Sequence, residues 1–531
     1  MKILTVVQIG EVDRLTTDRY RIPSLLLMEN AGRSVVDELE AACPGLYDKR
    51  IAIFCGRGNN GGDGFVVARY LALRGASPTI LLFSAPGKLR GDAKVNWDIV
   101  NAMGLQVTVL PTVTEAKSFL RKMPFQDVVV DALFGTGLSK PVDSNFRPVV
   151  EWINNVSSRA FVAAVDIPSG IMADTHSIPG PAVRADMTVT FSALKLAHVL
   201  PPALDAAGRV VLARIGSPSE LFENPEYRLN LVDEIQVRKT LPQRPRDSHK
   251  GKFGHVYVVA GSRGKSGAAL MTGLAALRSG AGLATLWAPE SLQRDFVGKF
   301  PELMTESLPE TEDGTSAHAG AGKVLKWSKN VESLVVGPGL TTHPDTQKLV
   351  WDLVQRSPVP VVLDADGINA LATAAAGPLK NRLKQPIVIT PHPGEMARLA
   401  GIKTSEVQDR RLETACECAE QLRCYVVLKG FRTVIATPKG DIYINPTGNP
   451  GMATGGTGDV LAGMVGRFIA GWNLNRKNPG CPELVDFLCA AVYLHGLAGD
   501  LAAESMGEES LVATDLLGYL HQAFRKVRMR E

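Results

Sequence analysis

Short apolar runs rich in valine and isoleucine alternate with longer amphipathic stretches along almost the whole chain. The N-terminal half contains RIAIFCG, SPTILLFS, DVVVDALFG and FVAAVDIPSG, and the C-terminal half contains GHVYVVAGS, PVVLDADG and CYVVLKG. Strands of a parallel sheet are covered by helices on both faces, so they occur in a sequence as continuous apolar runs. The alternation therefore predicts an α/β protein built on parallel sheets.

The alternation weakens between about Arg214 and Gly254, where LPQRPRDSHKGKFG collects prolines, charges and glycines. A chain of 531 residues has room for two to four domains. We expect an N-terminal domain over 1–220, a linker over 221–240 and a C-terminal domain over 241–531. The glycine loops of the two halves differ in sequence, so the halves are not an internal repeat.

Charge, hydropathy and cysteine content indicate which kinds of partner and which compartment suit this protein. The 58 lysines and arginines nearly balance the 54 acidic residues, and no long run of one charge suggests nucleic acid. No apolar stretch has the roughly 18 residues of a membrane span, and MKILTVVQIGEVDR lacks the apolar core of a signal peptide. Seven cysteines without a CxxC pair fit a reducing compartment. We expect a cytoplasmic homo-oligomer that acts on small molecules and binds neither nucleic acid nor membrane.

The loop GRGNNGGDG follows the strand RIAIFCG, and Gly56, Gly58 and Gly61 fit the spacing GxGxxG. A dehydrogenase would place an acid about 20 residues further on, at the end of the next strand, but TILLFSAPGK ends without one. The loop instead carries Asn59 and Asn60, whose amide oxygens suit a ligand or cation. The start of the following helix favours a phosphate. The loop therefore predicts a phosphate or dinucleotide site outside the dehydrogenase pattern.

Two other predicted strands of the N-terminal half end in an acid. Asp131 ends DVVVD and Asp166 ends FVAAVD. Ligands of open α/β sheets bind outside the carboxyl ends of the strands, although one such acid can equally cap the next turn. Two of them beside a glycine loop favour a pocket.

The C-terminal half has small residues leading into an apolar helix, in NPTGNPGMATGGTGDVLAG. Gly455–Gly458 would expose the unpaired N–H groups of the helix start, which predicts an oxyanion or phosphate site. Asp459 could be an acid that stabilises the helix dipole by about 0.3–1 kcal/mol, or a base for an attacking hydroxyl. The sequence GTGD favours the base. GSRGKSG over 261–267 is not a P-loop, because that pattern needs glycine at Val259.

Five ordered motifs, LMENAG, GNNGGDG, VDALFGTGL, VDIPSG and TFSALK, resemble the NAD(P)HX epimerase domain of the bifunctional NAD(P)H-hydrate repair enzymes. The resemblance implies a Rossmann-like sheet with helices on both faces. It also implies that Asp166 faces the reacting ring and that K⁺ is bound by Asn60, Asp131 and Ser169. Inversion at C6 needs an acid that protonates the leaving hydroxyl and then activates water, and Asp166 is the candidate. Lys195 could hold that carboxylate ionised or orient it, or it could be a solvated lysine. The implied NAD(P)HX-binding residues are Asn59, Asn60, Gly61, Gly62, Asp63, Gly135, Thr136, Gly137, Leu138, Ser139, Lys140, Pro141 and Asp166.

Seven ordered blocks of the C-terminal half, among them VVGPGL, ITPHPGEMARL and GGTGDVLAG, resemble the ribokinase-like, ADP-dependent NAD(P)HX dehydratase of the same family. The resemblance implies that Asp459 is catalytic, with ADP as co-substrate and Mg²⁺ neutralising charge. Since no separate acidic motif for Mg²⁺ stands out, we expect phosphates and waters to hold it. The implied NAD(P)HX-binding residues are Ala269, Gly339, His392 and Asp459. The implied ADP-binding residues are Lys429, Gly430, Phe431, Arg432, Thr433 and Gly458.

The resemblance implies an enzyme that epimerises the R and S forms of NAD(P)HX and dehydrates (S)-NAD(P)HX with ADP, giving NAD(P)H, AMP and phosphate. Two alternatives remain, a vitamin-precursor kinase and an N-terminal dinucleotide sensor without turnover. ITPHPGEMARL and the fused N-terminal half argue against the kinase, and intact Asp131 and Asp166 argue against the sensor. Because TILLFS ends without an acid, we expect both NADHX and NADPHX to be substrates.

Overall fold

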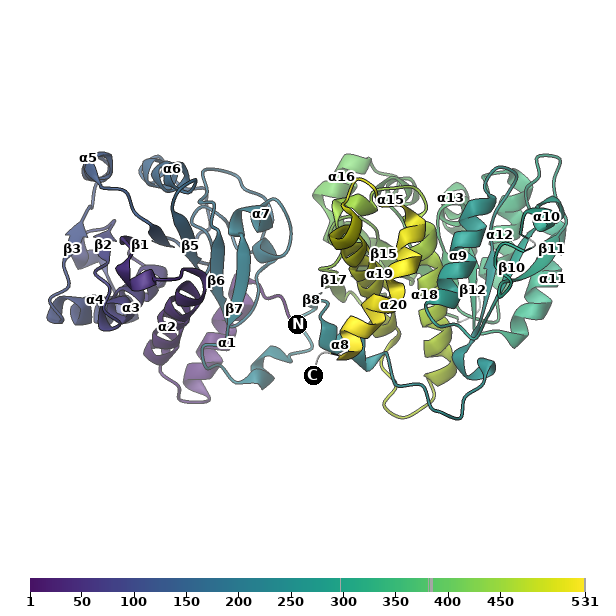
Figure 1. Ribbon diagram of the computed structural model, residues 1–531, viewed down its shortest axis with the longest axis horizontal. Helices are drawn as coiled ribbons and strands as arrows, with labels where there is room; N and C mark the ends of the chain where they lie inside the picture. Colours follow the sequence, from purple (N-terminus) through teal and green to yellow (C-terminus); the bar gives the residue numbers. More distant parts are fainter. Residues whose placement is uncertain (297, 381, 383–384, 530–531) are drawn as a thin grey trace. The chain divides into compact units, whose positions relative to one another are not determined.

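Two sheets organise the chain, one in each of its two units (Figure 1). The computed structural model describes residues 1–296, 298–380, 382 and 385–529. One unit is Lys2–Tyr227, and the other is Arg228–Glu531 together with Met1. The two α/β folds expected from the alternation of apolar runs are confirmed.

The N-terminal unit has a seven-stranded sheet in the order β3-β2-β1-β4-β5-β6-β7. Every pair of neighbouring strands in it is parallel. The strand order reverses between β1 and β4, which is where ligands bind in sheets of this kind. The strands are β1 (Ile51–Cys55), β2 (Thr79–Leu82), β3 (Val107–Val109), β4 (Val128–Ala132), β5 (Phe161–Val165), β6 (Met187–Phe191) and β7 (Arg209–Ala213).

Helices cover both faces of this sheet. Figure 1 shows α2, α3 and α4 on one face and α5 and α6 on the other, and each face has its own apolar core. Capping boxes at Thr5 and Thr112 start α1 and α5. The helices are α1 (Val6–Asp18), α2 (Ser24–Ala42), α3 (Asn59–Leu73), α4 (Gly91–Ala102), α5 (Val113–Lys122), α6 (Arg147–Val156) and α7 (Ala203–Ala207).

The C-terminal unit has a ten-stranded sheet in the order β11-β10-β9-β12-β13-β14-β15-β16-β17-β8. It is parallel except for β15-β16-β17, which form an antiparallel meander that the apolar runs did not predict. The order reverses between β9 and β12. The strands are β8 (Leu229–Leu231), β9 (His255–Val259), β10 (Leu283–Pro289), β11 (Met304–Leu308), β12 (Ser333–Val336), β13 (Val361–Leu363), β14 (Ile387–Ile389), β15 (Tyr425–Leu428), β16 (Val434–Ala436) and β17 (Ile442–Ile444).

The largest core of this unit packs helices α9, α18, α19 and α20 against one face of the sheet. Helix α19 is long and apolar enough to span a membrane, but most of its residues are buried in this core. The helices are α8 (Glu234–Lys239), α9 (Ser266–Arg278), α10 (Gln293–Phe296), α11 (Ala321–Trp327), α12 (Pro344–Arg356), α13 (Asp366–Thr373), α14 (Gly377–Lys380), α15 (Pro393–Ala400), α16 (Thr404–Asp409), α17 (Arg411–Leu422), α18 (Thr457–Asn475), α19 (Leu484–Met506) and α20 (Ala513–Met529).

The segment 221–240, expected to be a linker, is folded. It contains β8, which pairs in parallel with β17, and α8, whose N-cap Asp233 accepts from the backbone N–H of Gln236. The units meet between Tyr227 and Arg228. This division lies inside 221–240, but a strand of three residues, LNL, is too short to give a periodic pattern, so β8 was not predicted.

Candidate active sites

The first site lies where the loops after β1 and β4 meet. The backbone N–H of Gly56 donates to the carbonyl oxygen of Ala132 over 2.9 Å. A β-carbon at Gly56 would lie 1.9 Å from the carbonyl oxygen of Leu133, and one at Gly61 would lie 2.0 Å from the carbonyl oxygen of Gly56. The glycines of GRGNNGGDG are therefore required because backbone packs on backbone at the reversal of strand order.

Replacing Gly61 with alanine should destabilise the N-terminal unit by about 1–3 kcal/mol, because the new methyl group overlaps a backbone oxygen that has no room to move. Such a loss lowers the melting temperature by about 2–4 °C per kcal/mol for a unit of this size. Calorimetry measures the shift. Gly58→Ala is the control, since a β-carbon there meets no atom within 4 Å, and equal melting of the two variants would contradict the packing argument.

Helix α3 begins inside the NNGGD segment. Gly58 is its N-cap and makes no side-chain capping bond, so the N–H groups of the first turn face the loop. Asn60 and Asp63 are buried in that turn, while Asn59 is exposed. The structure thus puts five predicted dinucleotide-binding residues at a helix start, where an anion is favoured.

Asp131 ends β4 and is fully buried. Its carboxylate accepts from the backbone N–H of Ser169 over 2.7 Å and from the Ser169 hydroxyl over 2.6 Å. Burial raises the pKa of Asp131 to about 6, although the hydrogen bonds from Ser169 act to lower it. The buried Asn60 amide nitrogen makes no hydrogen bond, and its oxygen would lie 2.9 Å from a β-carbon at Gly135. Three buried side chains with oxygen ligands therefore border one loop, and hard oxygen ligands suit an alkali cation.

Asp166 and Lys195 form a buried ion pair. The Lys195 ammonium group donates to an Asp166 carboxylate oxygen over 2.6 Å and to the Thr190 hydroxyl over 2.7 Å. Lys195 is only 1% exposed, so it is not a solvated lysine. Burial raises the pKa of Asp166, but the charge and hydrogen bond of Lys195 outweigh burial and lower the pKa below its ordinary value. This lowered pKa favours an ionised Asp166, and the catalytic role of Asp166 remains a prediction.

Backbone and histidine contacts hold this pair in place. Asp166 has a left-handed backbone with φ of 64°, which is costly for a residue with a side chain and is typical of functional sites. His198 Nδ1 accepts from the Lys195 N–H over 3.2 Å, and its Nε2 donates to the Asp166 carbonyl oxygen over 3.0 Å. Burial, reinforced by the charge of Lys195, lowers the pKa of His198 to about 3. His198 is thus a neutral clamp, and sequence reasoning missed it.

Two further acids lie within electrostatic range of the pair. Burial raises the pKa of Asp63 well above its ordinary value, and the charges of Asp166 and Asp13 add to this. Burial also raises the pKa of Asp13, on α1, to about 6, and one of its oxygens is buried without a hydrogen bond. Sequence reasoning missed Asp13. The available signal was its place four residues after the buried Ile9, which puts it on the inward side of α1.

The second site lies at the start of α18. Gly456, in a left-handed conformation with φ of 97°, is the N-cap, and no side chain caps the helix. The Thr457 hydroxyl donates to the carbonyl oxygens of Met452 and Thr454, which fixes the turn. A β-carbon at Gly458 would lie 3.3 Å from the Lys429 ammonium nitrogen. The structure thus places Gly458 and Lys429, both predicted to bind ADP, side by side at a helix start.

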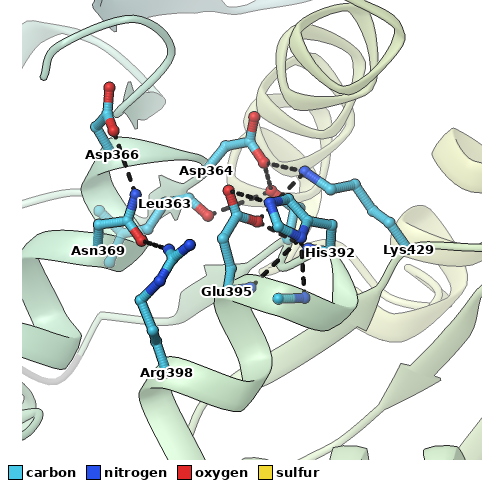
Figure 2. Close-up of polar contacts among 10 residues, drawn as sticks. Leu363, Asp364, Asp366, Asn369, His392, Glu395, Arg398 and Lys429 are labelled. Carbon is cyan, nitrogen blue, oxygen red and sulfur yellow. Dashed lines mark hydrogen bonds and ion pairs between the residues drawn. The ribbon is translucent and has the colours of Figure 1, made fainter. Parts of the chain in front are cut away.

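Acids from neighbouring strand ends surround Lys429 (Figure 2). The lysine ammonium donates to Asp364 over 2.6 Å and lies 3.9 Å from Glu395. Asp364 follows β13 and Glu395 lies in α15, which follows β14. Burial opposes the lysine charge, yet these carboxylates raise the pKa of Lys429. Sequence reasoning named neither Asp364 nor Glu395, although both lie in quoted segments, VLDADG and PHPGE. The expectation that phosphates and waters hold Mg²⁺ remains a prediction.

Asp459 lies in the first turn of α18, next to this group. Burial raises the pKa of Asp459 to about 7, the charge of Asp364 adds to the rise, and Lys429 opposes it. A carboxylate with such a pKa can accept a proton near neutral pH, as a general base must. The geometry favours the base.

His392 caps the start of helix α15, and its role in binding NAD(P)HX remains a prediction. It is the N-cap of α15, where its Nδ1 accepts from the N–H groups of Gly394 and Glu395, and its own N–H donates to the Glu395 carboxylate over 2.8 Å. Burial, then the charges of Lys429 and Arg398, lower the pKa of His392. The neutral ring presents Nε2 next to the acids, 3.4 Å from Glu395.

The other predicted residues of the C-terminal unit lie around this group. Ala269 is buried on α9, and Gly339 has a left-handed backbone next to Lys265. Residues 429–433 form the turn between the antiparallel strands β15 and β16, where Phe431 is exposed. The binding roles of these residues remain predictions.

Comparison with known proteins covers both units. Residues 256–522 match the family model described as NAD(P)H-hydrate dehydratase, and residues 24–197 match the one described as YjeF-related protein N-terminus. The chain is 42% identical over 528 residues to the bifunctional NAD(P)H-hydrate repair enzyme Nnr of Moorella thermoacetica, covering 99% of this chain and 97% of that one.

The Nnr of Escherichia coli is 33% identical over 496 residues, with 93% of this chain and 88% of that one covered. A solved structure, the ADP/ATP-dependent NAD(P)H-hydrate dehydratase from Bacillus subtilis co-crystallised with ATP/Mg²⁺, is 35% identical, covers 56% of this chain and 98% of its own, and has a TM-score of 0.47. On the full-length relatives, the chain belongs to the bifunctional NAD(P)H-hydrate repair enzymes.

Proposed function

We propose that the N-terminal unit epimerises the R and S forms of NAD(P)HX and that the C-terminal unit dehydrates (S)-NAD(P)HX with ADP, releasing NAD(P)H, AMP and phosphate. Family membership supports the pair of activities. The observation that carries the proposal is Asp459, a base with a pKa of about 7, in the first turn of α18 beside Lys429. A base and a phosphate-binding helix start in one place suit phosphoryl transfer to a hydroxyl.

In the dehydration, Asp459 takes the proton of the C6 hydroxyl, and the oxygen forms a bond to the β-phosphorus of ADP. The bond from that phosphorus to the bridging oxygen breaks, and AMP leaves with its electrons. The Lys429 ammonium group and the N–H groups of the α18 start stabilise the charge on the transferred phosphoryl group. The ring nitrogen then expels phosphate from C6, and loss of a proton from C5 forms the double bond of NAD(P)H.

The protein side chains of this site could supply only some of the ligands of a magnesium ion. Among the described residues, no group of three or more histidine, cysteine or acidic side chains is arranged to hold a metal ion. Mg²⁺ commonly uses one or two carboxylates together with phosphate oxygens and waters, and Asp364 and Glu395 are the carboxylates placed for it. When bound, Mg²⁺ neutralises charge on the phosphates.

In the epimerisation, the ring nitrogen pushes the hydroxyl off C6, and the departing oxygen needs a proton. Asp63, whose pKa is raised by burial and by neighbouring acids, is the donor, and the Asp166 carboxylate stabilises the cationic ring. Water then adds to the opposite face, returning one proton to Asp63. Asn60, Asp131 and Ser169 would hold K⁺, which when bound supplies a fixed positive charge beside the start of α3.

Dehydration should depend on pH through Asp459. The base is active when ionised, and its pKa is raised to about 7, so kcat/KM should fall about tenfold per pH unit below that value and level off above it. The measurement is kcat/KM for (S)-NADHX against pH at saturating ADP. A profile that stays flat down to about pH 5 would show that Asp459 is not the base.

The test of the proposed function is recovery of absorbance in the NADH band. A two-epimer NADHX mixture is incubated with the protein, Mg²⁺ and ADP, and AMP is quantified in parallel. Full recovery with one AMP per NADH supports both activities. Recovery of only the S portion supports the dehydratase alone and leaves the N-terminal unit as a sensor, and no ADP-dependent recovery refutes the proposal.

The substrate range, the oligomeric state and the compartment are proposed here as the sequence led us to expect them. We propose that NADHX and NADPHX are both accepted and that the protein is a cytoplasmic homo-oligomer. All seven cysteines are free thiols in the structure, which is consistent with a reducing compartment. Light scattering of the purified protein measures the oligomeric state.

A further inference from the structure

A polar groove of about 620 Å³ adjoins the second site and has no role in the chemistry described above. Its lining comes from α12, α13, α15 and the loop before α12, and comprises Thr342, Gln347, Asn369, Ala372, Thr373 and Arg398. Helices α13 and α15 carry Asp366 and Glu395 at their first turns and continue from there along the groove. The groove is therefore lined by the same two helices whose first turns carry acids of the second site.

Arg398 lines this groove, and a hydrogen bond to Asn369 fixes its positively charged side chain. Its guanidinium donates to the Asn369 side-chain oxygen, as Figure 2 shows. The Asn369 amide nitrogen donates to Asp366 over 3.2 Å, and the other Asp366 oxygen accepts from the backbone N–H of Thr341 over 2.8 Å. Within the part of the chain that the structure describes, no carboxylate lies within 4.0 Å of the Arg398 guanidinium. The guanidinium is positioned but its charge is not neutralised by a direct ion pair.

A second cation, at the start of α9, lies near the Asp366 carboxylate that Asn369 contacts. Lys265, the N-cap of α9, places its ammonium 3.6 Å from Asp366 and is 52% exposed. Lys265 belongs to GSRGKSG, the segment that does not fit the P-loop pattern. It packs close to Gly339, because a β-carbon added at Gly339 would lie 3.1 Å from the β-carbon of Lys265. Lys265 thus contacts Asp366 directly, and Arg398 reaches the same carboxylate through the Asn369 side chain.

We propose that Arg398 and Lys265 bind a phosphate of the hydrated dinucleotide while its nicotinamide ring is at Asp459. This inference rests on the proposed dehydratase activity. Arginine offers a planar set of N–H donors that fits phosphate oxygens, and lysine adds a mobile point charge. NADHX carries its phosphates in the pyrophosphate, and NADPHX has an additional phosphate on the adenosine ribose. Either source fits the groove chemically, and the two substrates distinguish them.

The test compares wild type, Arg398→Gln, Lys265→Gln and the control Arg356→Gln, whose guanidinium is exposed on α12 and pairs with Asp352. KM and kcat are measured for (S)-NADHX and (S)-NADPHX at saturating ADP. Loss of one charge-assisted hydrogen bond should raise KM about 10- to 100-fold while kcat changes by less than about twofold. Arg356→Gln should match wild type, and Arg398→Lys should recover part of the lost affinity.

A rise in KM for both substrates assigns the groove to the pyrophosphate, and a rise for (S)-NADPHX alone assigns it to the ribose phosphate. An unchanged KM for both substrates in an active Arg398→Gln enzyme overturns the inference and leaves the dehydratase activity standing. A fall in kcat with unchanged KM also overturns it, because Arg398 would then act only by supporting Asp366. Absence of ADP-dependent turnover in wild type refutes the proposed function itself.

Discussion

Asp459→Asn should abolish ADP-dependent recovery of NAD(P)H while leaving epimerisation intact. The variant keeps the shape of the side chain but removes the group that accepts the hydroxyl proton, and loss of a general base costs about 10²- to 10⁴-fold in rate. The substitution also removes one buried acid from a crowded set, so the fold should not suffer. Absorbance recovery on (S)-NADHX with ADP measures dehydration, and chromatography of the R and S forms measures epimerisation.

Asp515→Asn is the matched control for this experiment. Asp515 is also an acid in the first turn of a helix, α20, where it accepts from the backbone N–H of Val512. If Asp459 served only the helix dipole, the two variants would behave alike, each losing about 0.3–1 kcal/mol of stability and little activity. Retention of more than about a tenth of the wild-type rate in Asp459→Asn would therefore contradict its role as the base.

The second large effect is expected at the buried pair of the N-terminal unit. Asp166→Asn leaves the Lys195 ammonium buried without its counter-ion, which should cost about 3–5 kcal/mol of stability. It also removes the carboxylate next to the cationic ring, so recovery from a two-epimer NADHX mixture should stall once the S form is consumed. Calorimetry measures the first effect and the extent of absorbance recovery measures the second.

The double variant Asp166→Asn/Lys195→Met separates the two effects. Replacing both partners removes the unpaired charge, so stability should return toward wild type, as for other buried pairs replaced by apolar groups. Epimerisation should remain absent, because the carboxylate is still missing. A stable double variant that still restores the whole pool would show that the pair is structural, and a wild type that never epimerises would favour the sensor.

Most of the fold could be predicted from the sequence because buried parallel strands are apolar along their whole length. IAIFC, VVVDA and FVAAV are visible in the chain for this reason, and they form β1, β4 and β5 as expected. The run CYVVLKG contains β15, but the strand LNL, the strands β16 and β17 and the antiparallel pairing of β15 with β16 were not predicted. Strands of three or four residues at a sheet edge give no period, and whether neighbouring strands run parallel or antiparallel depends on the turn between them.

The candidate sites were predictable where chemistry is local in sequence. NNGGD and GTGD combine glycines, a helix start and an acid within a few residues, so both were found. The sequence offered Lys195 as a residue that could hold Asp166 ionised, but it could not establish the contact, because Lys195 lies 29 residues further along the chain. The acids Asp13, Asp364 and Glu395 were missed as site residues for the same reason. Each is ordinary in its own segment and gains a role only from neighbours on other strands or helices.

The backbone contact between the loops after β1 and β4 also determines where this unit can change during evolution. Because Gly56 and Gly61 leave no volume for a methyl group, a library that randomises these positions would consist mostly of unfolded protein. The rim over 136–141 is different, since it lies partly or fully at the surface and Gly137 has open space around it. New substrate preferences would therefore arise on this rim, while the glycine loop stays as inherited.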